Sequence, residues 1–473
     1  MTHKALPERG RAPDEVLDEL TGFAADDPDY RRGRTWSLVY HLDDAHEDFA
    51  ARAYRMYSSA NGLNPAAFRS LKRLESEIVS IEAGLFHGGA ETCGVLTSGG
   101  TESCLLAVKT YRDMARAKRR IRRPNMVLPA TAHVAWFKAS EYFGVKIRLL
   151  PMTADHATDI SRLKRLIDRN TVMVLGSAPE YPHGTIDPIA EMGAITAARG
   201  VPLHVDACVG GFILPFMEMN GVELPPWDFR VPGVTSISAD LHKYGYAAKG
   251  ASSILYRDLD ILKHQMFVYQ DWPGGVFASP ALLGTRPGGA YAAAWAVLQK
   301  FGVDGYRELA AQTTEAAEAL KDGIARIDGL RLLGRPQGPL LAYGSSDRAV
   351  NIFAVADQME KRGWNVNRVQ NPDGIHAMVT ARHRAVTGEY LADLGEAVAI
   401  VRADPSLAQA GGAATYGMLA HVPLRGMVKA RVLDAFASMY RAGGGELDLH
   451  EPAAPGLAER WMKKYVEWKS RRG

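Results

Sequence analysis

Between residues 126 and 256, short apolar runs alternate with longer amphipathic stretches, and this alternation limits the fold more than any other feature. The apolar runs have the length of buried strands, and the stretches between them carry apolar residues at the three- and four-residue spacing of helices. Such alternation predicts a mostly parallel sheet with crossover helices. The predicted strands are 126–129, 146–150, 172–175, 203–206, 234–238 and 253–256, and the predicted helices are 102–117, 137–143, 160–168 and 188–199.

The pattern changes on both sides of this region. The first 35 or so residues are polar and carry clusters of charge, so we expect an arm or a loosely packed extension, and helical spacing begins near Phe49. After Gly302, a long predicted helix (306–327) precedes two short strands (330–333 and 340–343), a helix (351–362) and a strand (374–380). We therefore expect an N-terminal segment (1–60), a large catalytic domain (61–329), and a smaller α+β domain with a loosely tethered tail (330–473).

Composition excludes several classes of protein. The chain has 473 residues, and its 56 Lys and Arg against 53 Asp and Glu give a formal net charge of +3, so no overall field attracts nucleic acid or an acidic membrane. The three cysteines lack the C-x-x-C spacing of a zinc knuckle or a disulfide framework. We see no uninterrupted apolar run of about 18 residues and no secretory signal, so we expect a soluble cytoplasmic protein.

One basic run, Arg116–Arg123, leaves an alternative open. It could mark a nucleic-acid-binding or membrane-binding module, or steer the chain weakly to an anionic membrane. It also follows an amphipathic helix and stops at Pro124, as the solvated end of a helix does. We favour the solvated helix end and expect no nucleic-acid partner.

A lysine follows the predicted strand 234–238, in the segment Asp240-Leu-His-Lys243. A lysine that forms a Schiff base must lose its proton, and a partly buried position near other cations lowers its pKa. His242 and Lys249 are such neighbours, so we expect a lowered pKa for Lys243. The alternative is a surface loop with two solvated lysines.

Asp206 stands at the end of another predicted strand, 37 residues before Lys243. A carboxylate in that place is unfavourable unless it is paired. Pyridoxal 5'-phosphate (PLP) is one partner, because its ring nitrogen must stay protonated to serve as an electron sink. A structural or capping aspartate is the alternative.

Two further motifs precede Asp206. The turn Thr97-Ser-Gly-Gly-Thr101 leads into a predicted helix, where Gly100 and Thr101 could present backbone N–H groups to a phosphate. His133 follows a strand, where its ring could stack on an aromatic cofactor. A simple helix cap and a structural histidine are the respective alternatives. The phosphate turn, histidine, aspartate and lysine nevertheless occur in the order found in fold-type-I (aspartate-aminotransferase-like) PLP enzymes, and we expect that fold.

Longer segments sharpen this expectation. From about Ser37 to Val422 the chain resembles the sphingosine-1-phosphate lyase family of the group II decarboxylase-like PLP enzymes. The segments that carry the resemblance are Val39-Tyr-His41, Tyr181-Pro-His-Gly-Thr-Ile-Asp-Pro188, 236–250, Asp271-Trp-Pro-Gly-Gly-Val-Phe-Ala-Ser-Pro280 and Gly284-Thr-Arg-Pro-Gly-Gly289.

The resemblance implies a role for each site residue. Lys243 would form the internal aldimine, Asp206 would pair with the pyridine nitrogen, and His133 would stack on the ring. The residues implied to hold the cofactor phosphate are Gly100, Thr101, His242 and, from a second subunit of a homodimer, Thr285. The residues implied to bind substrate or transfer protons are Tyr40, Asn61, Tyr181 and Lys249. The implied reaction is retro-aldol cleavage of a phosphorylated long-chain base to a fatty aldehyde and phosphoethanolamine. A soluble enzyme would collect this lipid from solution or by transient contact with a membrane surface.

One position departs from the family pattern. Its Asn-Pro-Leu-His-Pro segment reads Asn61-Gly-Leu-Asn-Pro65 here, so Asn64 replaces a histidine that can carry charge. Phosphate affinity, pH dependence or substrate choice could therefore differ. Two alternatives stay open on the same scaffold: an amino-acid decarboxylase, and a PLP-binding protein that has lost catalysis.

Overall fold

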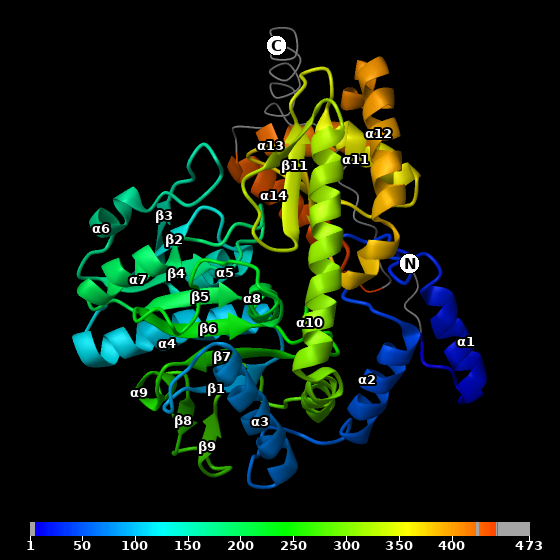
Figure 1. Cartoon of the computed structure of the whole chain (residues 1–473). Helices are drawn as coiled ribbons and strands as arrows, with labels where there is room; N and C mark the ends of the chain where they lie inside the picture. Colours follow the sequence, from blue (N-terminus) through cyan, green and yellow to red (C-terminus); the bar gives the residue numbers. More distant parts are fainter. Residues whose placement is uncertain (1–4, 422–424, 441, 443–473) are drawn as a thin grey trace.

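A seven-stranded sheet forms the centre of the computed structural model, which describes residues 5–421, 425–440 and 442 (Figure 1). The strand order is β1-β7-β6-β5-β4-β2-β3, and only β7 runs opposite to the others. The predicted α/β fold with a mainly parallel sheet is therefore confirmed. The strands are β1 (Cys93–Thr97), β2 (Asn125–Pro129), β3 (Lys146–Leu150), β4 (Thr171–Ser177), β5 (Leu203–Ala207), β6 (Val234–Ala239) and β7 (Ser252–Tyr256).

The inner strands of this sheet are buried on both faces, which explains why strands such as β2 and β4 read as continuous apolar runs. Side chains alternate between faces along a strand. Val174 of β4 accordingly lies in one apolar core, while its neighbours Met173 and Leu175 lie in another. The helices of this part are α3 (Arg69–Leu85), α4 (Gly100–Arg119), α5 (Val134–Phe143), α6 (Leu163–Leu166), α7 (Ile189–Ala198), α8 (Leu214–Met219) and α9 (Leu259–Leu262).

The chain forms a second sheet after the large one, with four antiparallel strands in the order β10-β11-β13-β12. This sheet matches the smaller α+β unit expected after residue 330. Its strands are β10 (Leu330–Leu333), β11 (Leu340–Ser345), β12 (Asn367–Val369) and β13 (Gly374–Met378). The helices that follow or flank it are α11 (Ile352–Lys361), α12 (Thr387–Ala403), α13 (Gly411–His421) and α14 (Arg425–Ser438).

One long helix, α10 (Gly288–Arg326), runs beside both sheets (Figure 1). Its backbone leaves the helical region at Gly302, whose φ of 57° favours glycine, so the helix is kinked there. The sequence predicts only the part from Tyr306 to Ile327. The longer helix is explained by burial, because residues 288–294 pack into the large core and extend the helix backwards.

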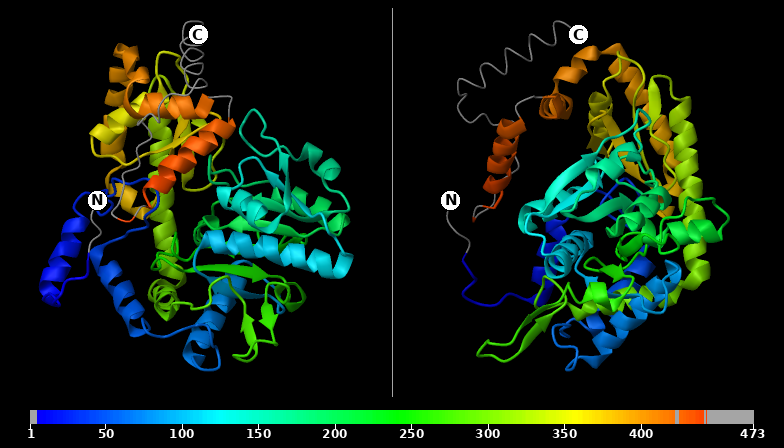
Figure 2. Two further views of the ribbon diagram at one scale, coloured as in Figure 1. Left: turned by 180° about the vertical axis from the view of Figure 1, so that it is seen from behind. Right: turned by 90° about the vertical axis from the view of Figure 1, so that its left-hand side faces the viewer.

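Two other predictions differ from the structure. Residues 160–168, predicted as one helix, form a three-residue 3-10 turn, capped by the side chain of Asp159 at the amide of Ser161, and the four-residue α6. The helix ends early because the backbone becomes extended at Ile167. The hairpin of β8 (Phe267–Tyr269) and β9 (Phe277–Ser279) was not predicted, and it projects from the molecule (Figure 2, right).

The N-terminal segment has two unlike parts. Helix α1 (Pro13–Phe23) buries none of its residues, whereas Trp36 is fully buried in the core of the small sheet. There the carbonyl of Trp36 accepts a hydrogen bond from the amide of Met378 at 2.9 Å. Helix α2 (Asp44–Met56) then packs on α10. The domain limits at residues 60 and 330 stay predictions, and the predicted tail from residue 443 lies outside the described residues.

The basic run Arg116–Arg123 covers the end of α4 and the turn after it. Arg119 donates to the carbonyl oxygens of Arg169 (2.8 Å) and Thr171 (3.2 Å), and Arg120 adopts the left-handed conformation that ends the helix. The solvated helix end therefore accounts for this run. Among the residues that the structure describes, no helix has the length and hydropathy needed to span a bilayer.

Candidate active site

The carboxyl ends of β4, β5 and β6 and the first turn of α4 surround a cavity of about 510 Å³. Loops at the carboxyl edge of parallel strands are the usual place for a ligand in such sheets. The cavity brings together eight of the predicted residues. They are Gly100, Thr101, His133, Tyr181, Asp206, His242, Lys243 and Lys249.

Lys243 lies in the loop that follows β6, and its amino group is 2.9 Å from a carboxylate oxygen of Asp240. Burial lowers the pKa of Lys243, but the charge and hydrogen bond of Asp240, together with the nearby Cys208 and Asp206, outweigh burial and raise the pKa above its ordinary value. The prediction of a lowered pKa for Lys243 is therefore wrong. Its physical reason is the carboxylate three residues earlier, which sequence reasoning did not weigh.

Lys249 is the lysine with a lowered pKa. Its amino group donates to the carbonyl of Leu38 at 2.9 Å and lies 5.3 Å from the ring centre of Tyr40. Burial of the ammonium group, together with repulsion from Lys243, lowers the pKa of Lys249 to about 8. A lysine in this state exchanges protons readily near neutral pH.

Asp206 is buried on β5, and two groups hold its carboxylate. The indole N–H of Trp136 donates to one oxygen at 2.8 Å, and the amide N–H of Cys208 donates to the other at 3.1 Å. Burial alone would raise the pKa of Asp206, but the Trp136 bond and the nearby His133 help to keep this pKa below its ordinary value. The side chain is therefore a buried carboxylate that faces the cavity.

The turn before α4 leaves its amide groups open to the cavity. Glu102 accepts hydrogen bonds from the amide and hydroxyl groups of Ser98 (2.7 and 2.6 Å), which fixes the turn, while Gly100 and Thr101 form the first turn of the helix. Amide groups in a first helical turn have no acceptor within the helix and attract anions.

His133 and Tyr181 face each other across the cavity, with ring centres 5.9 Å apart in an edge-on arrangement. His133 also caps α5 by accepting from the amide of Ala135 at 3.2 Å, and burial lowers its pKa, so the ring is neutral at pH 7. Burial raises the pKa of Tyr181, which keeps its hydroxyl group protonated.

The remaining predicted residues do not line this cavity. Tyr40 is buried beside it and donates to the sulfur of Met378 at 2.6 Å. The side-chain amide of Asn61 donates to the hydroxyl of Thr285 at 3.2 Å, and neither residue lines the cavity that contains Lys243. Asn64 is exposed, and its side-chain oxygen accepts from the amides of Ala66 and Ala67.

Four residues near the predicted site were missed by sequence reasoning. Asp240 pairs with Lys243, Trp136 binds Asp206, Asn367 donates to the hydroxyl of Tyr181 at 3.2 Å, and His376 stacks on the ring of Tyr181 with centres 4.4 Å apart. An acid three residues before a candidate lysine is a signal that could have indicated Asp240. Asn367 and His376 come from the small sheet, and no local pattern connects them to Tyr181.

The residues present fit PLP. Within the described part of the chain, the buried ring nitrogen Nδ1 of His242 has no hydrogen-bond partner. The His242 ring lies beside the open turn that contains Gly100 and Thr101, so this corner suits a phosphate. Asp206 supplies the negative charge that a protonated ring nitrogen requires, and Lys243 supplies the amine for a Schiff base.

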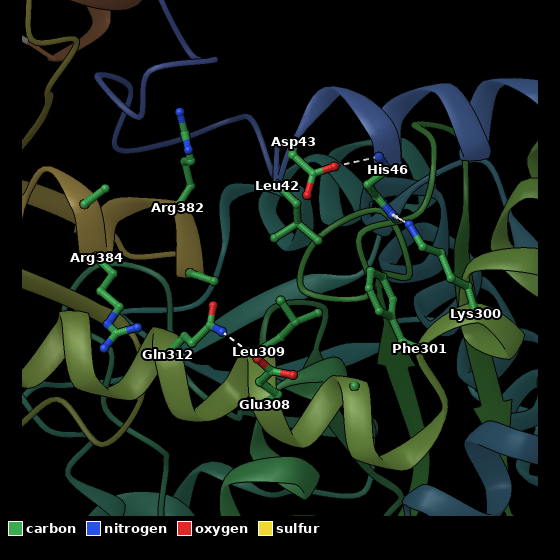
Figure 3. A pocket seen from close by; sticks show the side chains of 13 residues that line it. Leu42, Asp43, His46, Lys300, Phe301, Glu308, Leu309, Gln312, Arg382 and Arg384 are labelled. Atoms are coloured by element: carbon green, nitrogen blue, oxygen red, sulfur yellow. Dashed lines mark hydrogen bonds between the residues drawn. The ribbon is translucent and has the colours of Figure 1, made fainter.

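A second cavity, of about 610 Å³, lies between the start of α2, the kinked part of α10 and the turn 381–385 (Figure 3). Its cations, including Lys300 and Arg382, are accompanied by the carboxylates of Asp43 and Glu308, so no single charge dominates it. In its wall, Nε2 of His46 donates to the carbonyl of Tyr246 at 2.8 Å, which leaves Nδ1 to accept from Lys300 at 3.2 Å. His46 thus ties α2 to the loop that carries Lys243.

Comparison with known proteins identifies the family. Residues 73–343 match the model of the pyridoxal-dependent decarboxylase conserved domain. The chain is 41% identical over 432 residues to the sphingosine-1-phosphate lyase of rice, covering 90% of this chain and 79% of the relative. It is 39% identical to a solved structure of the Burkholderia pseudomallei sphingosine-1-phosphate lyase, with a TM-score of 0.83 and coverage of 92% of this chain and 97% of that one.

A glutamate decarboxylase from Lactobacillus brevis is more distant. Its solved structure is 24% identical to this chain, with a TM-score of 0.75 and coverage of 85% of this chain and 96% of that one, which shows a shared fold only. Identity of about 40% over nine tenths of the chain is far more specific. The chain therefore belongs to the sphingosine-1-phosphate lyase family of PLP-dependent enzymes.

Proposed function

We propose that this protein is a PLP-dependent carbon–carbon lyase that cleaves sphingosine-1-phosphate or a closely similar phosphorylated long-chain base. The products are a fatty aldehyde and phosphoethanolamine. The observation that carries the proposal is one cavity that gathers Lys243, Asp206, His133 and the turn at Gly100, in a chain whose relatives are lyases of this substrate.

PLP, when bound, supplies an electron sink for the carbanion left by carbon–carbon cleavage. The chain's residues would hold and tune it. The turn at Gly100 and Thr101, with His242, would hold the phosphate, Asp206 would keep the ring nitrogen protonated, and His133 would lie against the ring. The neutral state of His133 supports this role, since an uncharged ring is less strongly hydrated and stacks at lower desolvation cost.

Proton transfer falls to Lys249 and Tyr181 in this proposal. The substrate must lose the proton of the hydroxyl group next to its amine-bearing carbon. Lys249, with a pKa of about 8, can accept that proton at its amino nitrogen. Tyr181 remains protonated, so its hydroxyl group can donate a hydrogen bond or a proton but serves poorly as a base.

Substrate-phosphate binding is assigned to Tyr40, Asn61, Asn64 and Lys249, and Thr285 is assigned to the cofactor phosphate of a second subunit. Within one chain, Asn61 and Thr285 contact each other and lie outside the cavity wall. A homodimer with shared sites would give both residues a ligand. The exposed apolar side chains of the β8–β9 hairpin, which include Phe267, Val268, Trp272 and Val276, support such an interface.

We further propose that the protein works in the cytoplasm and collects its lipid substrate from solution or by brief contact with a membrane surface. The proposal rests on the absence of a spanning helix within the described residues. It predicts turnover of substrate presented in vesicles as well as in detergent micelles.

A product assay tests the proposal. The holoenzyme is incubated with sphingosine-1-phosphate, and mass spectrometry follows a long-chain aldehyde and phosphoethanolamine. We expect both products in equal amounts, and neither from Lys243→Ala, which should also lose the visible absorbance of the bound cofactor. Lys263→Ala, a surface lysine paired with Asp260, is the control. Release of carbon dioxide from amino acids, with no aldehyde, would establish the decarboxylase alternative instead.

A further inference from the structure

Asp240 is a buried carboxylate in the wall of the cavity, and the proposed reaction has not yet used it. It directly follows β6, is only 2% exposed, and lies 2.9 Å from the amino group of Lys243 through Oδ2. Its other oxygen, Oδ1, is buried and has no hydrogen-bond partner among the residues that the structure describes. A buried carboxylate is stable only when it is paired, so Lys243 is its main counter-ion.

Asp206 also carries a negative charge near Lys243, but its carboxylate already accepts hydrogen bonds from other groups. Asp206 is held by Trp136 and the amide of Cys208, and its charge is directed at the proposed cofactor ring. The side chains of His242 and Lys249 are either positively charged or neutral, so neither can serve as a counter-ion for the Lys243 ammonium group. Within the described part of the chain, the titratable groups that interact with Lys243 include Asp240, Asp206, Cys104, Cys208, His133, Tyr181, His242 and Lys249.

The position of the Asp240 carboxylate is fixed by its packing. A Cβ atom at position 100 would lie 2.7 and 2.9 Å from the two oxygens of Asp240 and 3.0 Å from the sulfur of Cys208. Only glycine fits there. Gly100 thus has two functions: it opens the turn that faces a phosphate, and it makes room for the carboxylate that faces the lysine.

We propose that Asp240 is the positioning residue that receives the amino group of Lys243 whenever this amine is free. The inference rests on the proposed function in one respect: Lys243 must alternate between a bonded and a free state in every turnover. Once substrate occupies the site, the released amine needs a partner inside a largely buried cavity. Asp240 binds it as an ammonium ion and keeps it within reach for the return step.

The test measures the protonation of Lys243 directly, without substrate. The full-length protein, freed of cofactor, is treated with a trace of acetic anhydride at a series of pH values, and peptide mass spectrometry gives the acetylated fraction of Lys243. In the wild-type protein the midpoint should lie above that of an ordinary lysine, near 10.5. In Asp240→Asn, which preserves the shape, the midpoint should fall by at least one pH unit.

Asp258→Asn is the matched control, because Asp258 caps α9 and asparagine caps a helix equally well. It should leave the Lys243 midpoint unchanged. In the holoenzyme, Asp240→Asn should lower kcat at least tenfold and change KM less. Asp240→Ser serves as a second variant should the asparagine protein fail to fold.

Two results would overturn the inference. One is a Lys243 midpoint that is the same in the wild type and both Asp240 variants. The other is a lowered midpoint with an unchanged kcat, which would make the ion pair irrelevant to turnover. Failure of the proposed function would give a different result. The wild-type protein would then form no aldehyde, while Asp240→Asn would still lower the midpoint of Lys243 acetylation as expected.

Discussion

The side-chain amide of Asn367 donates a hydrogen bond to the hydroxyl group of Tyr181 at 3.2 Å, and this bond joins the small sheet to the wall of the cavity. Tyr181 follows β4 of the large sheet, and Asn367 begins β12. The site is therefore completed by two parts of the fold that are separate in sequence. The stacking of His376 on the Tyr181 ring reinforces the same connection.

Asn367→Ala should orient Tyr181 less well and reduce kcat/KM by a factor of up to about ten, the value of one neutral hydrogen bond. Tyr181→Phe should cost more, because it also removes the proposed proton donor. Steady-state kinetics of both single variants and the double variant give the coupling between them. If the double variant were less active than Tyr181→Phe alone, Asn367 would act by some means other than its hydrogen bond to the Tyr181 hydroxyl, and the prediction would be wrong.

The Lys249 amine should set the pH dependence of turnover. Its neutral form increases as pH rises through about 8, so kcat should increase between pH 7 and 9. Arginine stays charged throughout this range, and Lys249→Arg should therefore lose both this increase and most of the activity. Lys263→Arg is the control for the change of residue type. A Lys249→Arg enzyme with the wild-type pH profile would show that another group is the base.

Trp136→Phe should weaken cofactor binding. It removes the hydrogen bond to the Asp206 carboxylate, and a bond to a charged group is worth about 1.5–3 kcal/mol, so the Kd for PLP should increase at least tenfold. Absorbance titration of the apoprotein measures this Kd. The control is Trp227→Phe, since Trp227 is equally buried but its indole nitrogen has no hydrogen-bond partner among the described residues. Equal effects on Kd from both variants would indicate loss of packing rather than loss of the bond.

Glu82 should make the folded state less stable as pH rises. It is fully buried, and burial raises its pKa to about 8, against 4.5 ordinarily. The folded state thus keeps a proton that the unfolded chain releases between pH 4.5 and 8, so stability decreases with rising pH in this window, by roughly 1 kcal/mol per pH unit. Glu82→Gln cannot release a proton. Urea unfolding at several pH values should therefore show that the free energy of unfolding of the Gln variant increases relative to that of the wild type as the pH rises. If the two free energies changed with pH in parallel, the raised pKa of Glu82 would be disproved.

The sequence indicated much of the fold because the sheet is buried on both faces. Strands such as β2 and β4 appear as continuous apolar runs. The carboxyl ends of β5 and β6 place Asp206 and the Lys243 loop at one edge of the sheet. The hairpin β8–β9 was not foreseen because its strands are only three residues long, too short for a periodic pattern. The four motifs singled out in the sequence meet in one cavity, where we propose that the cofactor binds.

Electrostatics explain what sequence reasoning got wrong. The state of Lys243 depends on the direction of one carboxylate, that of Asp240, and a linear pattern does not show which lysine that carboxylate faces. Contacts across the two sheets, such as the one from Asn367, depend on tertiary packing. Asn64 accepts hydrogen bonds from the amides of Ala66 and Ala67 in its own turn, a contact that comparison with the family segment did not indicate.

The proposed homodimer can be tested by mixing two defective subunits. If Thr285 acts in the partner's site, a subunit with Thr285→Val and a subunit with Lys243→Ala should form one complete site per mixed dimer. That site takes Lys243 from the first subunit and Thr285 from the second. Coexpression with two different affinity tags isolates the mixed dimer, which should recover about half of the wild-type activity by symmetry, since one of two sites is intact.

The same experiment separates action across the interface from action within one chain. If Thr285 instead served the site of its own chain, the mixed dimer would hold two defective sites, one without Lys243 and one without Thr285. Its activity would then not exceed the mean of the two parent dimers. The contact of Asn61 with Thr285 at 3.2 Å adds a further expectation. Asn61→Ala should be complemented by Lys243→Ala in the same way, because both residues would enter the partner's site together.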